Sequence, residues 1–267
     1  SSVTVDLSGD LELRATHLTE FAQAEATGFS VAGGLSIGVS LAQATASPTV
    51  TVSIGSGAAI DADGAVNVKA QTRANQSAFA EASPSGGGLL IGVNGGSATA
   101  TASATTTASF GAGADVRGGN GITLEADATN LATAQGESFA FGLLAGIGTM
   151  TTDAFTNGST RAFVADSAAT NLANITGGSF TVHAISEDQA VSKAQAASGG
   201  VVGGRGSDAS AQSRPPVEAS IGTNARIDIA LAQGNADLTV KAEYFAEADA
   251  VAQEVRGRRL AAFDHAQ

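Results

Sequence analysis

Aspartates in glycine-rich turns are the side chains of this chain whose type and spacing come nearest to metal chemistry. Asp61 and Asp63 lie in the segment 57–64, and Asp115 follows Gly113 two positions later. Calcium takes at least about six oxygen ligands, which a β-structure supplies when such turns stack on consecutive coils. The two turns lie far apart in the sequence, so we expect no cofactor. Asp61, Asp63 and Asp115 are the calcium candidates that the sequence offers.

Acid–base catalysis would need carboxylates or imidazoles that converge in a pocket. The candidate groups are three histidines and three mid-strand glutamates: His17, His183, His265, Glu81, Glu137 and Glu187. The histidines lie in distant parts of the chain, and the glutamates do not occupy one equivalent position of the repeat described below. We therefore expect no catalytic residues and no enzyme. A carbohydrate-binding or carbohydrate-cleaving β-helix stays open as the alternative function, and its mark would be a row of aromatic or carboxylate side chains.

The elements that must position these side chains form a long repeat. Five strand-like segments end with an apolar residue, a usually charged residue and an alanine, and these alanines are Ala15, Ala70, Ala126, Ala184 and Ala242. Their spacing is 55 to 58 residues. A fixed period of this length is typical of an array, in which each unit buries its apolar face against a copy of itself.

A second marker follows the same period. The segment 54–58, Ile-Gly-Ser-Gly-Ala, returns in related form at 110–114 and at 221–225. We expect one elongated repeat domain over residues 1–267, with units of roughly 1–47, 48–103, 104–160, 161–214 and 215–267. Neither end has the pattern of a cap, so we expect the array either to continue in a longer chain or to join head to tail.

Within a repeat, the alternation of side chains predicts strands. Val66–Ala70 alternates apolar and polar residues, and small residues then keep the even positions up to Ala82. The run 83–88 is rich in glycine and predicts a break, after which Leu89–Val93 begins a second pass. The fold class that we expect is all-β, a right-handed parallel β-solenoid, also called a β-helix. An antiparallel meander of long hairpins is the alternative, and each repeat forms either one wide coil or two to three smaller ones.

Composition excludes several classes of partner. The formal net charge is −12 and the pI is near 4.5. Nucleic acids and anionic membranes both need a basic face, so we expect neither as a partner. The longest apolar stretch, 139–150, is too short to cross a bilayer, and we expect no membrane insertion. Ser1–Val5 already fits a strand, which argues against a signal peptide at this position. The absence of cysteine does not decide the compartment.

The repeat pattern resembles that of large bacterial surface adhesins of the filamentous-haemagglutinin and leukotoxin type. The pattern is Ile-Gly-x-Gly-Ala, a Val-x-Val-x-Ala strand, an alanine-rich pass, a glycine cluster and a return strand, and it covers 3 to about 250. Two places depart from it: the turn at 165–168 lacks glycine, and 230–233 lengthens the last turn.

This resemblance implies an exported protein at the bacterial cell surface or outside the cell. The implied function is that of a structural stalk or filament segment of an adhesin, which projects or builds length by stacked β-coils. The implied partners are further copies of the chain or adjoining repeats of a longer chain, and a host or surface glycan.

Overall fold

The computed structural model describes residues 3–18, 21–73, 77–229 and 236–256, and every regular element in these ranges is a β-strand. The strands form four sheets, which we name the short, long, arm and return sheets. The described residues contain no helix, and so none that crosses a membrane.

Each sheet collects equivalent strands from successive repeats. The short sheet contains β1 (Thr4–Leu7), β6 (Ala59–Ala62), β11 (Asp115–Gly118), β15 (Ala173–Gly177) and β19 (Ala225–Ile229). The long sheet contains β2 (Leu11–His17), β3 (Phe21–Ala32), β7 (Ala65–Thr72), β8 (Ser77–Gly88), β12 (Gly121–Gly142), β16 (Phe180–Gly199) and β20 (Leu238–Arg256). The arm sheet contains β4 (Leu35–Ala46), β9 (Ile91–Ala102), β13 (Ala145–Thr156) and β17 (Val202–Ser213). The return sheet contains β5 (Thr49–Ile54), β10 (Thr105–Phe110), β14 (Ser159–Val164) and β18 (Val217–Ile221).

The five marker alanines form one continuous ladder. Ala15 pairs with Ala70, Ala70 with Ala126, Ala126 with Ala184, and Ala184 with Ala242, each in parallel register. One repeat is therefore one wide coil that contributes to all four sheets. Every ladder between the named strands is parallel, so the antiparallel meander is wrong.

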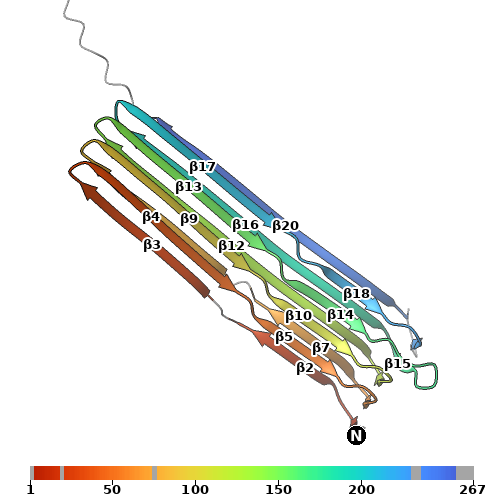
Figure 1. Ribbon diagram of the computed structural model, residues 1–267. Helices are drawn as coiled ribbons and strands as arrows, with labels where there is room; N and C mark the ends of the chain where they lie inside the picture. Colours follow the sequence, from red (N-terminus) through yellow and green to blue (C-terminus); the bar gives the residue numbers. More distant parts are fainter. Residues whose placement is uncertain (1–2, 19–20, 74–76, 230–235, 257–267) are drawn as a thin grey trace, which may run out of the picture.

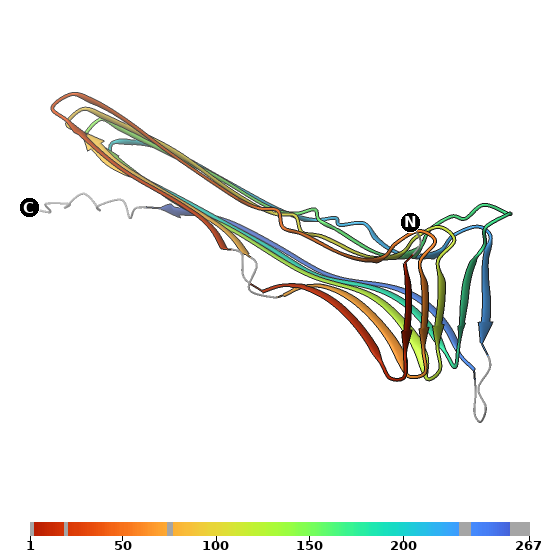
Figure 2. The ribbon, with the colours of Figure 1, turned by 90° about the horizontal axis from the view of Figure 1, so that it is seen from below.

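The coil has two parts, a head and an arm (Figure 1). In the head, the short sheet, the return sheet and the first part of the long sheet enclose a core, whereas the arm consists of two facing sheets (Figure 2). β12 has 22 residues and spans roughly 70 Å at about 3.3 Å per residue. Five stacked strands span only about 20 Å at the usual strand spacing. The longest dimension of this chain therefore runs along its strands and not along the stack.

Head and arm have different cores. Larger aliphatic and aromatic side chains fill the head, where the rings of Phe110 and Phe180 stack with centroids 6.1 Å apart. The apolar core cluster of the arm consists, in the described residues, of alanines and Met150, and polar side chains such as Asn94 and Thr152 are buried beside it. Met150 occupies the space that Gly96 and Gly136 leave, because a Cβ at either glycine would overlap its side chain. Small side chains thus make the arm thin, and the flexible methionine side chain fills the space beside the two glycines.

The glycine clusters at the far end of the arm coincide with the turns only in part: Gly33, Gly34 and Gly200 lie in turns, as expected, whereas other glycines there lie in strands. The two-residue turns fall at 33–34, 89–90, 143–144 and 200–201, so two of them consist of leucine pairs. Gly86–Gly88 instead continues β8, which corrects the expected break at 83–88. A Cβ at Gly88 would overlap the backbone oxygens of Ile91 and Gly34. Glycine is placed there because the two sheets meet backbone to backbone.

In the head, the second sequence marker does form a turn. Gly57, Gly113 and Asn224 each occupy the fourth position of the marker with φ of 67°, 66° and 56°, a left-handed conformation that glycine and asparagine adopt most readily. The turn at 165–168, which lacks glycine, is held by side chains instead. Asp166 Oδ1 accepts a hydrogen bond from the backbone nitrogen of Thr223 at 2.6 Å.

Candidate functional site

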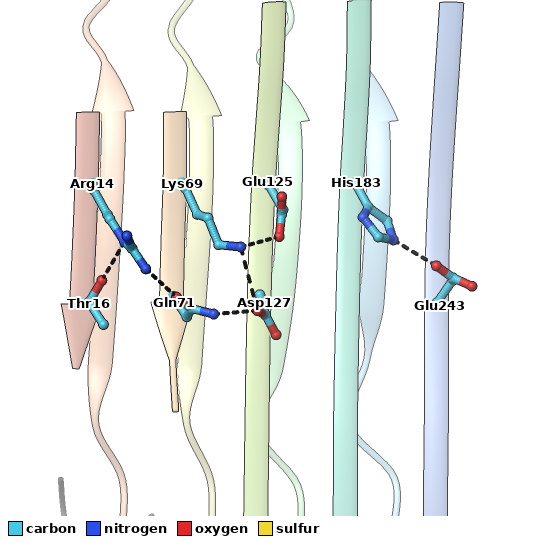
Figure 3. A network of polar contacts seen from close by, with 8 residues as sticks. All are labelled: Arg14, Thr16, Lys69, Gln71, Glu125, Asp127, His183 and Glu243. Carbon is cyan, nitrogen blue, oxygen red and sulfur yellow. Dashed lines mark hydrogen bonds and ion pairs between the residues drawn. The ribbon is translucent and has the colours of Figure 1, made fainter. Parts of the chain in front are cut away.

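A ladder of polar side chains crosses the outer face of the long sheet in the head (Figure 3). Arg14 donates to Gln71 Oε1 at 3.0 Å, and Gln71 donates to Asp127 Oδ2 at 2.6 Å. Lys69 Nζ lies 2.6 Å from Glu125 Oε1 and 3.8 Å from Asp127 Oδ2. Each of these contacts joins a donor on one coil to an acceptor on the next coil.

The same face continues with His183, Lys241 and Glu243. His183 Nε2 lies 2.8 Å from Glu243 Oε2, and Lys241 Nζ lies 2.7 Å from Glu243 Oε1. The hydrogen bond from Lys241, followed by the one from His183, holds the pKa of Glu243 below its ordinary value. Glu243 is therefore ionised at neutral pH. Except for the contact between Lys241 and Glu243, which is within β20, these contacts link neighbouring coils, so the ladder serves mainly to attach coil to coil.

A second polar cluster is buried where the head meets the arm. Asn130 Nδ2 donates to Asp188 Oδ1 at 2.5 Å, and Ser186 donates to Asp188 Oδ2 at 2.8 Å. Asn130 Oδ1 accepts a hydrogen bond from the backbone nitrogen of Ala104 at 2.8 Å, which ties the long sheet to the opposite wall. Asp188 is 4% exposed, and burial raises the pKa of its carboxyl group.

Sequence reasoning missed Asp188 and weighed its neighbour Glu187 instead. The sequence did contain a signal for this cluster. Asp188 is an even-numbered residue of β16, and the other even-numbered residues, such as Ala184 and Ala190, point inward. A carboxylate at an inward position requires hydrogen-bond donors, and Asn130 lies opposite it in the adjacent coil. The polar groups of this cluster hydrogen-bond to one another, so we interpret the cluster as a structural one that stabilises the junction of head and arm.

The calcium candidates lie on or beside the short sheet. Asp61 pairs in register with Asp6 on one side and Arg117 on the other, and Arg117 lies 3.2 Å from its carboxylate. Asp115 stacks between Ala59 and Asn174, not on another carboxylate, and Asp63 follows the end of β6. In the part of the chain that the structure describes, no group of three or more acidic, histidine or cysteine side chains is arranged for a metal.

The glutamates considered for catalysis occupy different positions of the ladder, as expected. Glu81 pairs with Gln135 on one side and with Glu25 on the other, Glu137 pairs with Gln195, and Glu187 pairs with Thr129. Glu81 and Glu137 line one surface hollow together with Lys193, and Glu187 lies apart from it. They do not form a carboxylate row. His183 lies on the coil-to-coil ladder, His17 ends β2, and His265 lies outside the described residues, as does the lengthened turn at 230–233.

The two ends of the stack are open. In the described residues, β2, β3, β4 and β5 pair on one side only, and so do β17, β18 and β20 at the other end. Inward apolar side chains of these end coils, such as Leu13 and Ile227, are only partly buried, whereas Leu124 and Val182 in the middle of the stack are 0% exposed. Each end thus exposes a cross-section of the core and unpaired backbone groups, which recruit further strands.

Comparison of this chain with family models, curated proteins and solved structures found no match.

Proposed function

We propose that this chain is a structural segment of a stalk or filament, whose coils stack on further coils to project or build length. The observation that carries the proposal is the pair of open ends, where core side chains and strand edges lack the neighbour that every middle coil has. Those neighbours would be adjoining repeats of a longer chain or further copies of this one.

The coil-to-coil contacts support a load-bearing role. Parallel ladders of the long sheet run through 20 consecutive pairs between β12 and β16, and polar side chains connect the same coils. Force along the stack would therefore be shared over many hydrogen bonds at each step. We further propose a right-handed coil, because parallel crossovers are right-handed in nearly all proteins, and five repeats as expected from the markers.

The proposed setting is the bacterial cell surface or the extracellular space, as part of an exported adhesin. It depends on the resemblance of the repeat pattern and on a composition that suits an exported fibre: no cysteine and a net charge of −12. A surface or host glycan would be bound by other regions of such an adhesin.

Sedimentation velocity over a range of concentrations tests whether the ends accept further coils. We expect concentration-dependent association of the chain, and end-to-end stacks in electron micrographs. Leu13→Lys and Ile227→Lys each place a charge in one exposed core cross-section, and each should weaken the association. Leu143→Lys makes the same type of change in an exposed turn of a middle coil and should not. Circular dichroism must show that all three variants keep the β-structure.

Monomers at every concentration would overturn the version of the proposal in which further copies of this chain supply the neighbouring coils. So would association that Leu143→Lys weakens as much as the two end variants, because the contact would then not be made by the ends of the stack.

A further inference from the structure

The far end of the arm presents an apolar ridge to solvent. Its members are the large side chains at or beside the two-residue turns of three successive coils: Leu89, Leu90, Leu143, Leu144, Val201 and Val202. Between 49% and 84% of each residue is exposed. We name these six residues the tip ridge. It runs across the stack where β8, β12 and β16 turn back into β9, β13 and β17 (Figure 1).

Apolar side chains continue from the ridge over both outer faces of the arm. Phe29 and Phe139 are exposed on the long sheet, at 80% and 51%, and Ile37 and Val39 on the arm sheet, at 64% and 75%. The apolar surface thus wraps around a thin edge. Contiguous apolar surface on a soluble protein, as opposed to scattered single residues, usually marks a site of interaction with a partner or a membrane.

In four successive coils this end of the arm carries no charge, although the chain as a whole carries −12, and two charges beside it, Arg205 and Glu254 at the last coil, pair with each other at 3.4 Å. Four windows that stack on one another contain no Asp, Glu, Lys or Arg: 27–42, 82–98, 138–152 and 194–204. A partner that is itself neutral and apolar fits this surface, whereas an acidic or basic one does not.

The backbone of the tip ridge is already hydrogen-bonded. Leu90 N donates to Gly34 O at 3.0 Å, Leu144 N to Leu90 O at 2.9 Å, and Val202 N to Leu144 O at 2.8 Å. A peptide group that enters hydrocarbon without a partner costs several kcal/mol, as a rough figure. These turns avoid much of that cost because each donates to the turn of the coil before it.

A groove on the long sheet opens beside the ridge. In register, Ser85 lies between Phe29 and Phe139, and Gly87 lies between Val31 and Phe141. The small residues form the floor and the large ones the walls of a space of about 610 Å³. The walls stand two strand spacings apart, roughly 9.6 Å between backbones, so the groove is narrow and elongated along the strands.

We propose that the tip ridge enters the interface of a neutral lipid layer, with an acyl chain in the groove between Phe29 and Phe139. A fluid lipid layer can contact both faces of a thin edge at once. The flat or convex surface of a folded protein contacts only one face. In this mode of binding the tip ridge lies in the lipid–water interface and does not span the bilayer. For this end of the arm only, the proposal replaces the expectation of no membrane insertion. It does not depend on the stalk function.

Flotation with phosphatidylcholine vesicles tests the proposal on the whole chain. We expect the chain to float with the vesicles, and Leu143→Ser with Leu144→Ser to weaken partition by at least about tenfold, because two half-exposed leucines lose their transfer to lipid. The matched control is Leu172→Ser with Phe245→Ser, which removes two exposed apolar side chains elsewhere and should leave partition unchanged. Mixing phosphatidylglycerol into the vesicles should weaken partition at low salt, because the chain is acidic.

Three results would overturn the proposal. The first is that the chain does not float with the vesicles. The second is that the two double variants lose partition equally. The third is that the chain forms oligomers without vesicles and that the Leu143/Leu144 double variant does not. The last result would mean that a second copy covers the ridge. Circular dichroism and the urea midpoint of each variant identify a loss that arises from unfolding.

Discussion

Backbone-to-backbone contact in the arm predicts a large effect for one added methyl group. Gly92 lies in β9 and faces β12, where a Cβ would overlap the carbonyl oxygen of Phe141 and lie 2.9 Å from its carbonyl carbon. Ordinary carbon–carbon contacts are about 3.5–4.0 Å, so the two sheets would have to separate. We expect Gly92→Ala to lower the free energy of unfolding by about 1–3 kcal/mol, the usual cost of overpacking.

The matched control is Gly95→Ala in the same strand. A Cβ at Gly95 would meet only the hydroxyl of Thr149, at 3.0 Å, and that side chain can rotate. Alanine is favoured over glycine in a strand interior by roughly 0.5–1 kcal/mol, so this variant should be neutral or slightly stabilised.

Urea denaturation followed by circular dichroism measures both variants. With a slope of about 1–3 kcal/mol per molar urea, Gly92→Ala should lower the midpoint by roughly 1 M, and Gly95→Ala should leave or raise it. Equal midpoints for the two variants would refute the close approach of the sheets.

Three further predictions concern the arm core, the buried carboxylate and the surface ladder. Met150→Ala should cost about 2–5 kcal/mol in unfolding free energy, and adding Gly136→Ala should recover part of it because the two sites share one space; strictly additive losses would contradict the packing. Burial raises the pKa of Asp188 above 3.8, so the folded state binds the proton more tightly and its stability should fall as pH rises through the folded pKa. Asp188→Asn should remove this slope in urea midpoints taken below pH 3.8 and at neutral pH, and an unchanged slope would exclude Asp188 as its source. Lys69→Met should cost about 0.5–1 kcal/mol at low salt and less at high salt, because its pair with Glu125 is partly exposed; a loss of the same size at both salt concentrations would show that the ion pair is not the cause.

Much of the fold could be predicted from spacing alone. The marker alanines, from Ala15 to Ala242, predicted a stack, and the structure places all five in one ladder. The alternation around Val66 predicted which side chains point inward. The number of coils per repeat could not be predicted, because 55 to 58 residues suit one wide coil or several small ones. Only the pairing of Ala15 with Ala70 distinguishes them.

The arm shows why the rest was not predictable. Glycine marks both a turn and a close approach of backbones, and a single sequence does not tell which. At Gly88 it marks the approach, and the turn falls on Leu89 and Leu90. The buried cluster at Asp188 was missed because its partners, Asn130 and Ala104, come from other strands and are brought to it by the coil.

Cryo-electron microscopy of the natural material that contains this segment tests the central claim most directly. Stacked coils that continue beyond this chain predict fibres whose strands lie across the long axis, with an axial step of about 4.8 Å for each repeat of 55 to 58 residues. Compact isolated particles, or an axial step that does not match one coil per repeat, would contradict the account.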